Sequence, residues 1–326
     1  MIQQFKNINF LNIFLLFAFT YILRIGLFLE LPQMINTGFS EVGTRLLLAD
    51  NQYNYLSPGL NVFLAGLVVF TQALLFNRLI SEYNILSRPT FLPALMYIVL
   101  SSVFTPFLFL SPPLIGNFFI LFIFFKILDS YKKTDLIATM FDLGLITALA
   151  TVIYFPFVFF VIALWIALLI FRSFNWREWV AVILGYMVVV TFLGVYYFWN
   201  NRLSYFFEIW KPLTEGFPIF IKIQPADYTV LLPITIGLIL GVLRLRENFY
   251  RSYIQMRKTF IFLFYLFVTV VFSFYLKPDY RINHFLLGVI PIALLLAYYF
   301  LNAVKRWFYE PLFLIIVGFI VYFQFV

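Results

Sequence analysis

The chain has 326 residues, of which 64% are apolar and 11% charged, and its mean hydropathy is +0.99. Soluble domains contain about 45–50% apolar and about 25% charged residues, so a water-soluble core could not bury this much hydrocarbon. The formal net charge of +8 is spread along the chain between apolar segments, and we expect lipid rather than nucleic acid as the partner.

Apolar windows of about 19 residues predict eleven transmembrane helices. They cover residues 9–29, 58–77, 91–110, 113–129, 136–154, 156–172, 179–198, 228–245, 259–276, 284–303 and 310–326. The long run from 134 to 179 is typical: it holds two crossings with Pro156 between them, because a ~30 Å hydrocarbon layer needs about 20 helical residues. We therefore expect an all-α, polytopic integral membrane protein with short interfacial helices.

We expect one integral domain over residues 1–326, with an N-terminal module at 1–172, an outer interfacial loop at 199–227 and C-terminal helices at 228–326. Lys6 precedes the first apolar run as in a signal peptide, but Arg24 and the lack of a small-residue cleavage site favour a retained helix. Most lysines and arginines fall between alternate spans, which predicts a cytoplasmic N-terminus in a bacterial inner membrane.

The most basic segment, residues 244–258, lies on the predicted inner side. Cations beside a membrane leaflet attract anionic lipid by about 1 kcal/mol each, so we favour a topology anchor, with partner docking as the alternative. The cations of this segment are Arg244, Arg246, Arg251, Arg257 and Lys258.

Two ionisable side chains fall inside predicted spans, where a charge costs about 2.5–3.5 kcal/mol and calls for a partner or a role. For Asp142, packing or a hydrogen bond between helices is favoured over proton or ion coupling. For Arg24, the sequence leaves open an anchor that reaches the membrane surface and a ligand for a phosphate group. The two lie in opposite halves of the predicted bilayer, so we do not expect them to pair.

Acids and cations gather in the predicted outer segments. An acid can deprotonate an acceptor while cations neutralise a departing phosphate, as transfer from a phosphate-activated donor requires, although any solvated loop has a similar composition. The acids are Glu30, Glu41 and Asp50, and the cationic or basic groups include Lys277, Arg281 and His284. The chain has no cysteine and one histidine, which excludes disulfides, thiolate catalysis and His-rich metal clusters.

Five short segments, in this order along the chain, carry a resemblance to a known family. They are Ser40-Glu41 leading into VGTRLLLAD, Ser57-Pro58-Gly59-Leu60, SRPTFLPAL from Ser87, FDLGLITALATVIYFPF from Phe141, and KPDYRINHFLLGVIPIALLLA from Lys277. Together they resemble the GT-C superfamily, the polytopic glycosyltransferases that use polyprenyl-phosphate sugars.

The resemblance implies a membrane-embedded cavity open to the outside, with Glu41 in the acidic catalytic position and Arg281 and His284 near a lipid phosphate. Ser40 stands where an acid is common in that family, and Ser57 and Gly59 replace an expected lysine and proline. Either one carboxylate acts alone or the fold has lost its chemistry, so a non-catalytic subunit of a larger membrane complex is the alternative and a transporter the third hypothesis. Many relatives need a divalent metal, but no ligand spacing identifies one here, and the cofactor stays undefined.

Overall fold

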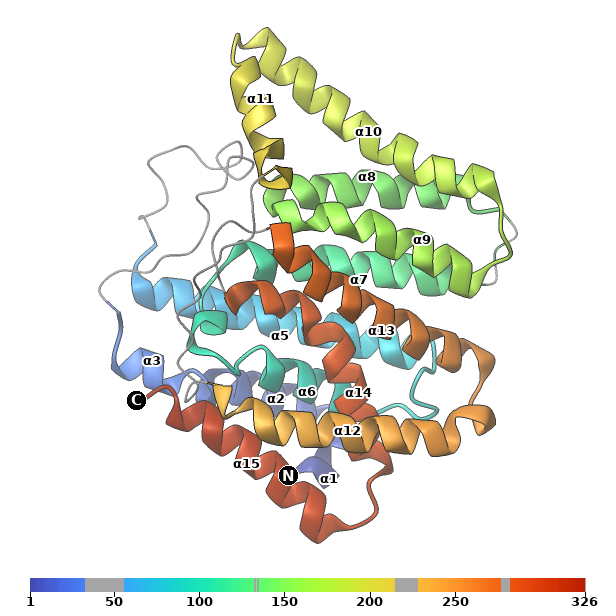
Figure 1. Ribbon diagram of the computed structural model, residues 1–326. Helices are drawn as coiled ribbons and strands as arrows, with labels where there is room; N and C mark the ends of the chain where they lie inside the picture. The colour runs from blue at the N-terminus through green and yellow to red at the C-terminus, as the bar shows by residue number, and fades with distance from the viewer. Residues whose placement is uncertain (33–55, 132, 134, 215–227, 277–281, 326) are drawn as a thin grey trace.

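The computed structural model describes residues 1–32, 56–131, 133, 135–214, 228–276 and 282–325 (Figure 1). Every regular element in these ranges is helical, which confirms the expected all-α membrane fold. Glu41, Asp50, Lys277 and Arg281 lie outside the described residues.

The α-helices follow one another along the chain. They are α1 Ile2–Phe5, α2 Leu11–Ile22, α3 Ile25–Leu29, α5 Pro58–Glu82, α6 Leu92–Leu100, α7 Pro112–Ser130, α8 Ile137–Ile153, α9 Phe160–Phe171, α10 Trp176–Trp199, α11 Leu203–Trp210, α12 Leu231–Asn248, α13 Ile254–Ser273, α14 Val289–Asn302 and α15 Arg306–Tyr322. Short 3-10 helices join or extend them: η1 Thr105–Leu108, η2 Phe155–Phe159, η3 Lys211–Leu213, η5 Phe249–Arg251, η6 Phe274–Leu276 and η7 Ile282–Gly288.

Each predicted span overlaps at least one of these helices, but their lengths differ. Within the described residues, 5 helices are long and apolar enough to cross a bilayer: α5, α7, α10, α13 with η6, and η7 with α14. Three more, α2, α8 and η2 with α9, are apolar but shorter. The chain is therefore a helical membrane protein, and the number of eleven crossings stays a prediction.

The centre of the bundle is formed by α6 and α14, which pack against each other (Figure 1). All of α6 is buried, from Leu92 to Leu100, and most of α14 is buried as well. A helix that is apolar all round is typical of such a central position. At 1.5 Å per residue, however, α6 is about 14 Å long, too short for a ~30 Å hydrocarbon layer. After α6 the chain continues through η1. The sequence alone predicts one regular span at 91–110, so the structure divides this span into two shorter helices.

The predicted outer segment 199–227 is described as far as residue 214. It holds α11, whose Ile209 is buried while Phe207 is exposed, and its position at the interface stays a prediction.

Cations cap the C-terminal end of α14 at the predicted inner face. Arg88 Nη2 donates to the carbonyl of Leu301 at 2.9 Å, and Lys6 Nζ donates to that of Ala303 at 3.4 Å. The last carbonyls of a helix lack partners within the helix and carry partial negative charge, so these contacts satisfy them and fix the helix end. Burial and the nearby charge of Arg88 lower the pKa of Lys6, and Glu310 acts in the opposite direction.

The closest helix contact joins α8 and α10, which cross at Gly144 and Gly185. A Cβ atom on Gly144 would lie 2.1 Å from the carbonyl oxygen of Val182, and one on Gly185 would lie 2.0 Å from that of Phe141. The two backbones therefore touch directly, a packing that small residues permit and that holds membrane helices together without a hydrophobic driving force.

We predict that Gly144→Ala or Gly185→Ala forces these helices apart and lowers the free energy of unfolding by about 1–3 kcal/mol, the usual effect of overpacking. Thermal unfolding of the purified protein in detergent measures this. Gly318→Ala in α15 is the matched control, because a Cβ there would have no atom within 4 Å. That variant should be neutral or more stable by up to about 1 kcal/mol; equal losses in all three would contradict the prediction.

Candidate functional site

The first predicted membrane helix breaks at Leu23 and Arg24, between α2 and α3. The amide of Leu23 still bonds to the carbonyl of Phe19, but that of Arg24 bonds to Tyr21 in a tighter turn, and the helix restarts at Ile25. A break inside a membrane helix leaves backbone groups that water cannot satisfy, so other parts of the protein must do so.

A side chain from the far end of the sequence satisfies this break. Gln324 Nε2 donates to the carbonyl of Leu23, and Gln324 Oε1 accepts from the amide of Gly26 at 3.2 Å. In Figure 1 the C-terminal end of α15 lies beside α3. A Cβ on Gly26 would be 2.7 Å from Cβ of Gln324, so only glycine lets the amide approach this closely. One side chain thus bonds to both sides of the break.

Arg24 itself is fully buried, with 0% of the residue exposed. Its Nη1 donates to the carbonyl of Thr20 at 2.9 Å and to Ser102 Oγ at 3.4 Å. Ser102 Oγ in turn donates to the carbonyl of Ile98 at 2.9 Å. A cation that snorkels would hold its head at the surface, so the burial argues against the surface anchor, and the role as a phosphate ligand stays a prediction.

One edge of the Arg24 guanidinium has no partner among the described residues. Nε and Nη2 are both buried and make no hydrogen bond. Together they form the planar fork that binds a carboxylate or a phosphate through two parallel N–H···O bonds. An unsatisfied buried donor costs about 1–3 kcal/mol, and more when it is charged. An anion on this edge would remove that penalty, so we take it as the candidate site.

Buried polar groups extend from α6 into the neighbouring helices. Tyr97 Oη donates to Gln72 Oε1 at 2.8 Å, and Gln72 Nε2 donates to the carbonyl of Leu114 at 2.7 Å. Asn117 Nδ2 donates to the carbonyl of Leu286 at 3.0 Å, which joins α7 to η7. These bonds hold the start of α7 and the helix η7 in fixed positions beside α6.

His284 was expected near a lipid phosphate at the outer mouth, but it is fully buried inside the bundle. Its Nε2 lies 2.9 Å from the carbonyl of Val270 and 3.2 Å from Ser273 Oγ, and its Nδ1 lies 2.8 Å from Tyr154 Oη. A carbonyl can only accept, so Nε2 carries a proton and donates to Val270. Both nitrogens bind protein groups, so His284 acts here as a tie between η2, α13 and η7.

The other predicted site residues fall in different places. Glu30 ends α3 and is exposed, on the same short helix that follows the break. Asp142 is exposed on α8 and forms no hydrogen bond between helices among the described residues, unlike the expected interhelical role.

The basic segment 244–258 is a helical hairpin formed by the ends of α12 and α13 with η5 between them, rather than an open loop. Arg244 pairs with Glu247 at 2.8 Å, and Lys258 Nζ donates to the carbonyl of Phe171 at 3.2 Å, which caps α9. The side chain of Arg257 lies over the ring of Phe249 at 5.9 Å.

Arg246 and Arg251 are exposed. The other three cations of this hairpin contact protein groups, so fewer cations are available to lipid headgroups than the sequence suggests. Within the part of the chain that the structure describes, no group of three or more His, Cys, Asp or Glu side chains is arranged to hold a metal ion.

Sequence reasoning missed the partners that build the site. Gln324 and Ser102 are uncharged and sit far from Arg24 in the sequence, so no local pattern connects them. The signal that existed was the presence of amide and hydroxyl groups within strongly apolar runs, since such groups need partners inside a membrane.

Comparison with known proteins gives a family but no activity. The profile of a family of unknown function, DUF6427, matches residues 39–326. No curated protein and no solved structure matches the chain.

We predict that Gln324→Leu lowers stability by about 1–3 kcal/mol for each buried group that it leaves unsatisfied, the Leu23 carbonyl and the Gly26 amide. Unfolding in detergent measures the change. Gln255→Leu is the control, because the Gln255 side chain forms no hydrogen bond with any described residue. Similar stability of the two variants would show that the amide does not hold the break.

Proposed function

The chain belongs to the DUF6427 family of unknown function, and we propose that it binds a polyprenyl-phosphate-linked sugar in the membrane and transfers the sugar to an acceptor at the outer face. The observation that carries the proposal is the buried Arg24 guanidinium with its unpaired Nε and Nη2 edge. This activity is the one expected from the resemblance to the GT-C superfamily.

A phosphorylated lipid fits the surroundings of Arg24. Its phosphate would accept two hydrogen bonds from the Nε and Nη2 edge, and its isoprenoid tail needs an apolar environment. One turn beyond Arg24, Leu27 packs in a small apolar cluster with Val62 and Leu108, which belong to α5 and η1. The guanidinium edge for the headgroup and the apolar side chains for the tail therefore lie one helical turn apart along the chain.

Irregular backbone within or beside the predicted spans supports a binding site in the membrane. In hydrocarbon, non-helical segments persist only where protein buries them or where they line a cavity. Here the residues 101–111, 154–159 and 274–276 with 282–288 depart from α-helix within or beside predicted spans. Discontinuous helices of this kind form substrate sites in membrane transporters as well. That observation keeps transport as a third candidate.

The proposed reaction is a displacement at the anomeric carbon of the donor sugar. The acceptor hydroxyl oxygen forms a bond to C1, the bond between C1 and the phosphate oxygen breaks, and polyprenyl phosphate leaves with the electron pair. A carboxylate takes the acceptor proton, and Arg24 stabilises the negative charge that develops on the phosphate. No oxidant or reductant is needed.

The carboxylate is assigned from the sequence. Glu41 is the first candidate, because it matches the acidic position of the resembled family, and Glu30 and Asp50 are the alternatives. Lys277 and Arg281 remain the proposed further cations for the phosphate. His284 is withdrawn from that role, because both its nitrogens bind protein groups.

A non-catalytic subunit of a membrane complex is the second candidate, and α10 favours it. Beyond the crossing with α8, its far end turns away from the bundle toward α11 (Figure 1). Phe192, Phe198 and Trp199 on that part are 70–83% exposed. Lipid can cover this surface, and so can a helix of a partner protein.

We predict that Arg24→Lys weakens the binding of polyprenyl phosphate about tenfold or more, because an ammonium keeps the charge but not the planar two-bond fork. Native mass spectrometry of the detergent-purified protein measures binding, and thermal unfolding measured in parallel shows that the variant is folded. Arg202→Lys, a change at an exposed cation at the start of α11, is the matched control and should bind normally. Unchanged binding by Arg24→Lys would remove the phosphate site.

We predict that Glu41→Gln abolishes sugar transfer from a polyprenyl-phosphate donor without lowering the yield of folded protein, whereas Glu30→Gln retains it. Transfer is measured with a radiolabelled donor in proteoliposomes. Full activity of Glu41→Gln would overturn the assignment of the base. The subunit hypothesis would be favoured if the wild-type protein transfers no sugar and co-purifies with another membrane protein at fixed stoichiometry.

A further inference from the structure

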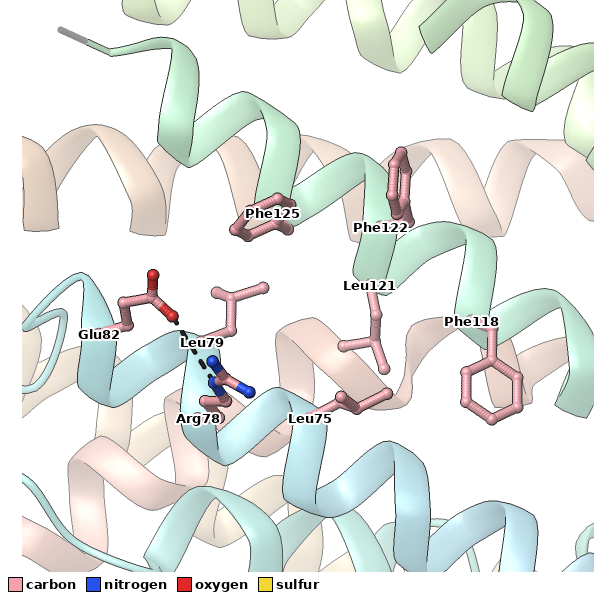
Figure 2. Close-up of a pocket in the computed structure, with 8 residues that line it drawn as sticks. All are labelled: Leu75, Arg78, Leu79, Glu82, Phe118, Leu121, Phe122 and Phe125. Atoms are coloured by element: carbon pink, nitrogen blue, oxygen red, sulfur yellow. Dashed lines mark ion pairs between the residues drawn. The ribbon is translucent and has the colours of Figure 1, made fainter. Parts of the chain in front are cut away.

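A groove runs between α5 and α7, and Arg24 is not among the residues that line it (Figure 2). Its volume is about 470 Å³, within the roughly 300–1,000 Å³ of small-molecule sites. Figure 2 shows Leu79 and Leu121 pointing into the space between the two helices. The apolar side chains that line it are Leu75, Leu79, Phe118, Leu121, Phe122 and Phe125.

One end of the groove carries two opposite charges. Arg78 and Glu82 belong to the last turns of α5, where the chain leaves the apolar segment, and both line the groove. Their closest atoms, Nε and Oε2, are 3.9 Å apart, and the side chains are 82% and 53% exposed. A pair this long and this exposed contributes little to stability, so both groups are free to bind a ligand. Lys126 Nζ lies 5.7 Å from the ring centre of Phe122, which brings a second cation beside the groove.

We propose that this groove binds phosphatidylethanolamine. The lipid phosphate binds the guanidinium of Arg78, the primary ammonium donates to the carboxylate of Glu82, and one acyl chain lies along the apolar wall. A phosphate and an ammonium a few atoms apart match a cation and an anion spaced one helical turn apart on α5. A phosphatidylglycerol headgroup would bring no cation to Glu82, and a choline headgroup has no N–H to donate.

The headgroup rather than the tail sets the selectivity. Lipid tails are as apolar as leucine, so an acyl chain gains little free energy when it leaves the bilayer for an apolar groove. The groove fixes where the chain lies, and the charges at its end decide which phospholipid stays. None of these residues takes part in the Arg24 site, so this inference does not depend on the proposed activity.

The test is lipid binding to the delipidated, detergent-purified full chain, followed by native mass spectrometry. The probes are phosphatidylethanolamine, phosphatidylglycerol and phosphatidylcholine with identical acyl chains. We expect the wild type to retain phosphatidylethanolamine at least threefold better than the other two. Glu82→Gln should abolish the preference over phosphatidylglycerol, and Arg78→Met should weaken the binding of all three.

A matched pair of tryptophan substitutions tests the groove itself. Leu75→Trp fills the groove and should lower phosphatidylethanolamine binding at least threefold. Leu67→Trp places the same bulk on an equally exposed position of α5 outside the groove, at 43% exposure against 45%, and should leave binding unchanged. Equal binding of the three lipids by the wild type, a preserved preference in Glu82→Gln, or equal effects of the two tryptophans would each overturn the proposal.

Discussion

Inside a bilayer no water is available to pair with an exposed backbone group, and this constraint governs the break in the first membrane helix. The carbonyl of Leu23 and the amide of Gly26 find their partners in a single side chain, the amide of Gln324. The break in turn places Arg24 inside the bundle, where Thr20 and Ser102 hold one of its nitrogens. The open edge of the guanidinium is therefore a consequence of how the backbone around it is satisfied.

The positions of the helices could be predicted from the sequence because a long apolar run has few alternatives to a helix in lipid. Each predicted span overlaps a helix, and α5 and α7 end within a few residues of the expected bounds, apart from the C-terminal end of α5, which continues to Glu82. Composition could not show that α6 is too short to cross a bilayer, because its sequence is as apolar as that of a full span. The irregular backbone that follows it depends on contacts with other helices.

The candidate site could be predicted only in part. A lone cation in an apolar run marked Arg24 as a residue with a role, but sequence alone could not distinguish a surface anchor from a buried ligand. The decisive facts, zero exposure and an unpaired edge, arise from partners that the chain brings together only on folding. For His284, the sequence indicated an exposed residue, because it follows a predicted polar turn. In the structure His284 is buried and contacts Tyr154 and Val270.

The tie between Gln324 and the first helix also bears on biogenesis. The two partners are 301 residues apart in the chain. At a synthesis rate of about 5–20 residues per second, the ribosome needs roughly 15–60 seconds to add the second partner after the first. During that interval the Leu23 carbonyl and the Gly26 amide lack the partner that they have in the folded structure. The contact between the first helix and the C-terminal end of α15 can therefore form only after Gln324 has been synthesised.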